Sequence, residues 1–108
     1  MPFVSKLESL PLQHCSILDF LFPEGEVPST KPLWIEAADP AQWLSPKSAL
    51  DLARRFGHGL QRLGVKPGDR CLLFTPNHIM VPVSYLGIVG AGAAFSGANP
   101  AFTETGGL

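Results

Sequence analysis

The sequence predicts a small α/β protein whose centre is one βαβ unit with two parallel strands. Two helical patterns and two short strand patterns predict this class. An amphipathic helix is expected at residues 46–63, a strand at 70–74, and an apolar helix and a second strand after it. Short joints between strand, helix and strand are typical of a parallel pair with a right-handed crossover. With 108 residues, the chain has room for one small domain.

The first part of the chain, residues 1–31, is predicted to be an extension with one short helix. Ser16 and Asp19 fit a capping box, in which the serine oxygen accepts from a first-turn amide and Asp19 reaches back. Pro23 ends this helix, and a Pro- and Gly-rich loop follows. A hairpin is then expected from Leu33–Ile35 and Gln42–Leu44.

The clearest element is the helix after Ser45, a good N-cap that precedes a proline in the first turn. Gly64 is expected to end it in the left-handed conformation. Asp51 and Arg55 have the i,i+4 spacing of an ion pair. The apolar stripe predicted to face the core is Ala49, Leu52, Ala53, Phe56, Leu60 and Leu63.

The βαβ unit is expected to begin after a turn at Lys66–Asp69. A strand at Arg70–Phe74 leads to a helix from His78 or Ile79 to Ala91, which is apolar nearly all round. The second strand is predicted at Ala93–Ser96. Because no Asp, Glu, Lys or Arg occurs from residue 71 to 103, this part is expected to be covered by other structure.

The tract Gly90-Ala91-Gly92 looks like the start of a dinucleotide-binding G-x-G-x-x-G fingerprint. Phe95 occupies the third glycine position, where only a hydrogen or methyl group fits, and Asn99-Pro100 interrupts the helix that should follow. We therefore interpret the two glycines as the end of a buried helix and a site of close packing.

A membrane span is the second interpretation of this stretch, because residues 79–98 are uncharged and long enough to cross a bilayer. The small residues, the serines and the absence of flanking Lys or Arg argue against it. A net charge of −1 gives no electrostatic reason to bind nucleic acid. Because neither a secretory signal nor a C-terminal peroxisomal signal is found, we expect a cytoplasmic location.

We predict no catalytic, cofactor-binding or metal-binding residue in this chain. The spacing of metal ligands is absent from His14, His58 and His78. His14 and Cys15 do not indicate a nucleophile pair, because the side chains of neighbouring residues seldom face each other. The basic residues after position 53 are expected to form a solvated helix face.

Several stretches together resemble the N-terminal part of the adenylate-forming acyl/aryl-CoA ligases, the 4-coumarate–CoA ligase-like group. Their order and spacing over most of the chain support the resemblance more than any single motif. The stretches are Asp19–Pro23, Pro32–Glu36, Leu63–Arg70, Thr75–Asn77 and Gly97–Thr103.

This resemblance implies an incomplete N-terminal portion of a three-layer, parallel-sheet adenylate-forming domain, with residues 32–108 as its partial AMP-binding subdomain. In the full-length family, a carboxylic acid, ATP and Mg²⁺ give an acyl-adenylate, which coenzyme A converts into a thioester. The lysine-bearing phosphate loop and the later family motifs are absent, and Thr103–Gly107 does not replace them. We therefore expect a truncated fragment that is inactive alone.

Two alternatives stay open beside the ligase fragment. One is a small single-span membrane protein. The other is a non-catalytic partner that pairs with a full-length ligase through an open sheet edge, an edge that could also support self-association.

Overall fold

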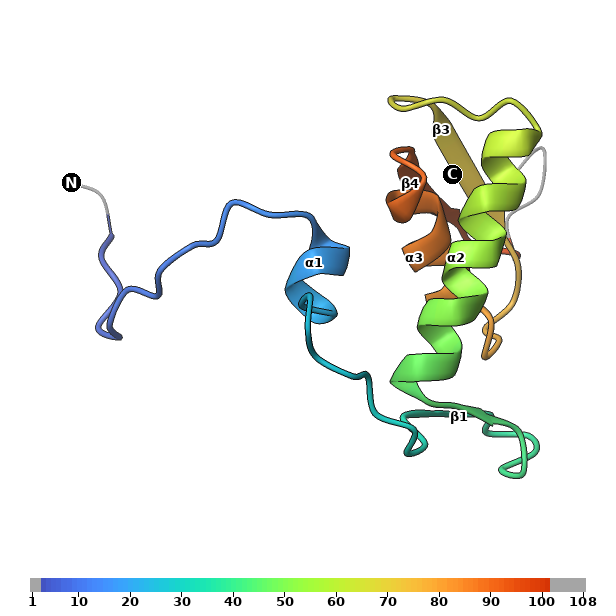
Figure 1. Cartoon of the computed structure of the whole chain (residues 1–108), viewed down its shortest axis with the longest axis horizontal. Coiled ribbons are helices and arrows are strands. Elements are labelled where there is room, and N and C mark those ends of the chain that lie inside the picture. The colour runs from blue at the N-terminus through green and yellow to red at the C-terminus, as the bar shows by residue number, and fades with distance from the viewer. Residues whose placement is uncertain (1–2, 102–108) are drawn as a thin grey trace.

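The computed structural model describes residues 3–101. Within these residues the chain forms two small sheets and three helices (Figure 1). In chain order the elements are α1 Ile17–Leu21, β1 Trp34–Ile35, β2 Trp43–Leu44, α2 Pro46–Arg62, β3 Arg70–Phe74, α3 Val81–Gly90 and β4 Ala94–Ala98. Mixed helix and strand with a parallel pair confirms the predicted α/β class.

Helix α1 starts at Ser16, whose Oγ accepts a hydrogen bond from the Asp19 N–H at 3.1 Å. This is one half of the predicted capping box, because no bond from the Asp19 side chain back to Ser16 accompanies it. Leu18 and Phe22 pack against the core, and they connect this short helix to the body of the protein.

The hairpin is confirmed as an antiparallel pair in which Trp34 lies opposite Leu44 and Ile35 opposite Trp43. Because side chains alternate along a strand, Trp34 and Leu44 share one face of the hairpin. Both pack against the core, whereas Trp43 on the other face is 45% exposed.

Helix α2 is capped at both ends, as its sequence predicts. Ser45 accepts from the Ser48 N–H, and the Ser48 hydroxyl accepts in return from the Ser45 N–H at 2.9 Å. At the other end, Gly64 has φ 101°, and the N–H groups of Gly64 and Val65 bond to the Gln61 and Leu60 carbonyls. This arrangement is a Schellman motif, which uses carbonyls that a helix end leaves unpaired.

The buried face of α2 differs in part from the predicted stripe. Ala49 and Ala53 are buried, but Leu50 and Gly57 complete the face, and Leu63 is 85% exposed at the C-cap. The prediction for Leu63 was wrong because the helix ends at Arg62 and Leu63 is its exposed C-cap. Phe56, also in the predicted stripe, is 38% exposed. Asp51 pairs with Lys47 at 3.3 Å; no ion pair with Arg55 occurs.

Strands β3 and β4 are parallel, as predicted, and Arg70 lies opposite Ala94 and Phe74 opposite Ala98. Strand β4 therefore extends two residues beyond the predicted end at Ser96, because its pairing with all five residues of β3 sets its length. Helix α3 contacts both α2 and β4. The Tyr85 and Phe95 rings meet edge-on, with 5.1 Å between the ring centroids.

The core lies between α2 and α3. Ala49, Ala53, Val83 and Leu86 form its centre. A methyl group added at Gly57 would lie 2.9 Å from the Gly87 carbonyl oxygen, closer than real contacts allow. The two helices therefore touch backbone to backbone at this glycine pair, a contact that the sequence analysis did not predict.

The stretch predicted as a possible membrane span is divided between a helix of 10 residues and a strand. Among the helices of residues 3–101, none has the length and hydropathy that crossing a bilayer requires. The structure gives the membrane interpretation no support.

The N-terminal arm, residues 3–15, extends away from the body (Figure 1). The radius of gyration is 17.1 Å. A compact chain of this length would have about 13 Å. The arm accounts for this difference because it adds length without packing on the helices.

Candidate functional site

The carboxyl ends of β3 and β4 are where the topology places a candidate site. Ligands of parallel α/β sheets bind in the crevice outside the carboxyl ends of the strands. Because Phe74 lies opposite Ala98, the segments Thr75–Asn77 and Asn99–Ala101 leave the sheet at the same edge. This edge offers hydroxyl and amide groups from Thr75, Asn77 and Asn99.

Local hydrogen bonds occupy several polar groups at this edge. The Asn99 Oδ1 accepts from the Ala101 N–H at 2.9 Å, and His78 Nδ1 accepts from the Met80 N–H at 3.0 Å. Glu36, after strand β1, accepts from the Ile79 N–H through its Oε2 at 3.2 Å. The bond to Glu36 ties the hairpin to the segment before α3, beside a cavity of about 240 Å³.

The Gly90-Ala91-Gly92 tract has the structural role that the sequence analysis assigned to it. Gly92 has φ 85° and follows the C-cap of α3, and the Gly92 and Ala93 N–H groups bond to the Val89 and Ile88 carbonyls. A methyl group at Gly90 would lie 2.7 Å from Leu18 Cδ1. The tract ends a helix and lets α1 approach, whereas a dinucleotide fingerprint follows a strand and opens a helix.

A magnesium ion is implied by the family resemblance, so the available ligands matter. Hard cations of this kind prefer carboxylate oxygens. In the part of the chain that the structure describes, no three His, Cys, Asp or Glu side chains gather closely enough to hold a metal ion. The residues present do not fit a metal site, and no step through such an ion is assigned to them.

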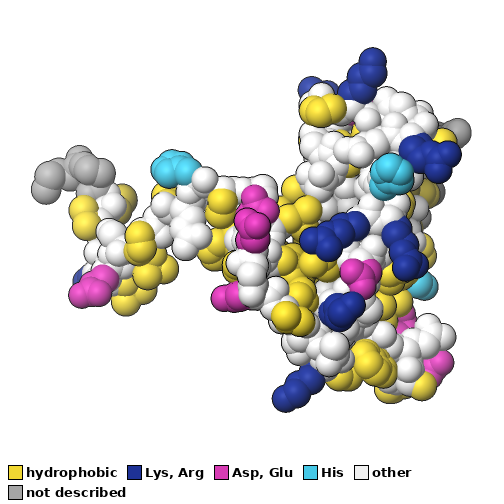
Figure 2. Space-filling model, in the orientation of Figure 1, with side chains coloured by type: hydrophobic (Ala, Val, Ile, Leu, Met, Phe, Trp, Pro, Cys, Tyr) yellow, Lys and Arg dark blue, Asp and Glu magenta, His cyan; other side chains and the backbone are white. Residues whose placement is uncertain are grey.

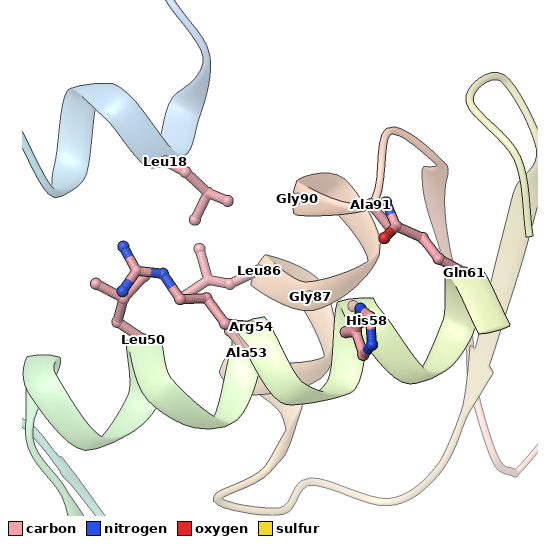
Figure 3. A pocket seen from close by; sticks show the side chains of 11 residues that line it. Leu18, Leu50, Ala53, Arg54, His58, Gln61, Leu86, Gly87, Gly90 and Ala91 are labelled. Atoms are coloured by element: carbon pink, nitrogen blue, oxygen red, sulfur yellow. The ribbon is translucent and has the colours of Figure 1, made fainter.

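Basic side chains gather on the exposed face of α2, around an acidic one (Figure 2). Arg54 and His58 from this face border a groove of about 280 Å³ between α1, α2 and α3. Figure 3 shows Arg54 directed toward α1, and Leu18 facing it from the opposite side. The solvated face predicted for these residues is correct, but the groove beside it was not foreseen.

No site residue was predicted from the sequence, and two features of this region were not predicted either. Glu36 and Ile79 are separated by 43 positions, and only the fold brings them together. The groove depends on Leu18 meeting Gly90, again from distant positions. We predicted that Thr103–Gly107 does not replace the phosphate loop of the family, and these residues lie outside the described part of the chain.

Comparison with known proteins gives the family. Residues 26–106 match the family of AMP-binding enzymes. The match begins at residue 26, six residues before the predicted start of the second domain, and that boundary stays a prediction.

Relatives in fungi have similar sequences. An acyl-CoA ligase of Aspergillus niger is 32% identical over 95 residues, which cover 88% of this chain and 18% of the relative. A phenylacetyl-CoA ligase of another Aspergillus niger strain is also 32% identical over 95 residues, 88% of this chain and 17% of that protein. The chain thus spans less than a fifth of the length of these relatives.

Solved structures agree with the sequence comparison. A benzoate CoA ligase from Burkholderia xenovorans superimposes with a TM-score of 0.72 and 29% identity, over 83% of this chain and 18% of that one. ATP-bound MatB from Rhodopseudomonas palustris gives 0.71 and 27%, over 82% and 17%. With its fold and three quarters of its sequence matched, this chain belongs to the AMP-binding enzyme family.

Proposed function

We propose that this chain is a scaffold segment of an acid–CoA ligase and that it forms no acyl-adenylate by itself. The observation that supports this most is the β3–α3–β4 unit, a parallel pair inside the region that matches the family. The unit supplies two strands and a polar carboxyl edge, around which a longer protein can build a site.

The charge of this edge supports the second half of the proposal. A site for ATP needs backbone amides and a cation near the phosphates while the carboxylate attacks the α-phosphorus. The sequence holds no Lys or Arg from Cys71 to Thr103, which includes both strand ends. The carboxylic acid, ATP and coenzyme A are thus proposed substrates of a whole ligase that contains this segment.

Pyrophosphate exchange into ATP tests the inactivity of the chain. The purified chain is assayed with aromatic and fatty acids, and the Aspergillus niger acyl-CoA ligase serves as the positive control. We expect no exchange above the level of a reaction without protein. Exchange that depends on an added acid would contradict the proposal.

A chimera tests the scaffold role. Residues 26–106 replace the matching segment of the same fungal ligase, and thioester formation is measured with several acids. We expect the chimera to remain active and to keep the acid preference of the fungal enzyme. A folded but inactive chimera, or one with a new acid preference, would mean that this segment does more than support the fold.

The open edges of the β3–β4 pair favour a second candidate, a non-catalytic partner of a full-length ligase. Within residues 3–101 each of these strands pairs only with the other. Unpaired strand edges promote pairing with another chain, so self-association through the edge belongs to the same proposal. Co-purification of a tagged chain with a full-length ligase would support the partner role, and its absence under mild conditions would oppose it.

A further inference from the structure

The N-terminal arm exposes a run of large apolar side chains. Relative exposures are 82% or more for Phe3, Val4, Leu7, Leu10 and Leu12. The arm has no helix or strand, and it projects from the body (Figures 1 and 2). Contiguous apolar surface of this kind marks a place where proteins bind other molecules.

The groove between α1, α2 and α3 combines apolar and basic surfaces. Leu18, Leu50 and Leu86 line its apolar end, and Arg54 and His58 lie one helical turn apart along its rim (Figure 3). Its volume of about 280 Å³ suits a few side chains of an extended segment. A segment that fills it must therefore be apolar with one acidic group.

Arg54 forms no ion pair within residues 3–101. Lys47, on the same helix, pairs with Asp51 at 3.3 Å. Within residues 3–101 this is the one ion pair formed, so no carboxylate lies within 4 Å of the Arg54 guanidinium. Asp19, Glu24, Glu26 and Asp51 line a second cavity together with Arg54, and none of them pairs with it. A carboxylate that reached the groove would gain a partner without losing another.

We propose that the arm of one copy docks in the groove of a second copy, with Glu8 beside Arg54. In an extended segment, side chains two positions apart point to the same side, so Glu8, Leu10 and Leu12 form one acidic and apolar edge. Four residues of extended chain span about 13 Å. The rim from Arg54 to Gln61 spans about 10 Å of helix, which is shorter than the arm segment but of the same order.

A second copy fits the geometry better than the chain's own arm. The arm leads away from its own groove (Figure 1). If two copies exchange arms, the contact is made twice around a two-fold axis and closes at a dimer. Pro11 holds Leu10 in extended conformations, which lowers the entropy lost on docking.

Charge reversal tests the pairing of Glu8 with Arg54. The mass of the full chain is measured by sedimentation equilibrium over a range of concentrations. Glu8→Arg and Arg54→Glu should each raise the dimer dissociation constant about tenfold, because attraction becomes repulsion. The double variant should bring it back near the parent value, since the pair is restored with opposite signs.

Two further variants control the experiment. Arg55 is also exposed on α2 but lines a different depression, so Arg55→Glu makes the same charge change outside the groove. It should leave the dimer unchanged. Leu10→Ser removes an apolar contact from an exposed arm and should weaken the dimer without changing the circular dichroism spectrum.

Several results would overturn the proposal. A parent chain that is monomeric at every concentration would rule out arm exchange. The proposal is also wrong if Arg55→Glu weakens the dimer as much as Arg54→Glu, or if the dissociation constant of the double variant does not return toward the parent value. Finally, Ser96→Lys charges the edge strand β4; if it abolishes the dimer while Glu8→Arg does not, the sheet edge joins the copies instead.

Discussion

The helix layer and the outer face of the β3–β4 pair are packed to very different degrees. Between α2 and α3, Val83 is 1% exposed and Leu86 4%, and two glycines bring the backbones into contact. On the strands, Leu72 and Phe74 are 66% and 57% exposed. One face of this unit has found its partners within residues 3–101, and the other has not. The relatives that this chain matches are about five times as long.

The largest expected effect separates these two regions directly. Leu86→Ala should lower the free energy of unfolding by about 2–4 kcal/mol, because it leaves a cavity between the helices. Leu72→Ala should change it by about 0.5 kcal/mol or less, because this side chain is already in solvent. Urea unfolding followed by circular dichroism measures both. Equal losses would show that the strand face is covered in solution.

The glycine contact gives the next largest effect. Gly57→Ala places a methyl group against the Gly87 carbonyl and should destabilise the chain by about 1–3 kcal/mol. Gly59 lies on the same helix with no atom near its added methyl group. Gly59→Ala should therefore stabilise the chain by about 0.5–1 kcal/mol through helix propensity. If both variants are stabilised, the helices do not touch at Gly57.

The two serine caps should also contribute unequally to the free energy of unfolding, with the larger contribution from the cap of the packed helix α2. Ser45 is 4% exposed and begins a helix of 17 residues, so Ser45→Ala should lower the unfolding free energy by about 1 kcal/mol. Ser16 caps a helix of five residues, none of them buried, and Ser16→Ala should change the unfolding free energy by about 0.3 kcal/mol or less. The midpoint of urea unfolding compares them. A larger loss for Ser16 would mean that α1 is part of the cooperative core.

The exposed ion pair should have the smallest effect. The side chains of Lys47 and Asp51 are 51% and 47% exposed, so water and salt screen them. Lys47→Gln should lower the unfolding free energy by about 0.5 kcal/mol or less, and 1 M salt should remove the difference. Arg55→Gln, at a position that forms no ion pair within residues 3–101, is the matched control and should be neutral. A loss from Lys47→Gln that persists in salt would indicate a role other than charge.

Much of the local structure could be predicted because neighbouring residues encode it. Ser45 and Gly64 fixed the ends of α2, and Gly92 the end of α3, through hydrogen bonds within a few positions of each residue. The parallel pair could be predicted from the order strand, helix and strand. The burial of Leu50 in place of Leu63 could not be predicted, because it depends on where α3 lies.

The candidate site was predicted less well than the fold. The sequence showed that no Lys or Arg lies between Cys71 and Thr103. It could not show that Glu36 bonds to the Ile79 N–H or that Leu18 covers Gly90, because both contacts join segments far apart in the chain. The groove beside Arg54 exists only where three helices meet.

By itself, the sequence determined the helix caps and the order of the elements, since each depends on residue types at short spacing. It also determined the resemblance to CoA ligases, which depends on the order of several stretches along the chain. The tertiary structure alone decided which face of each element is buried, where Gly57 meets Gly87, and which groove lies beside the arm. Such contacts arise from packing between distant segments, and no local pattern specifies their partners.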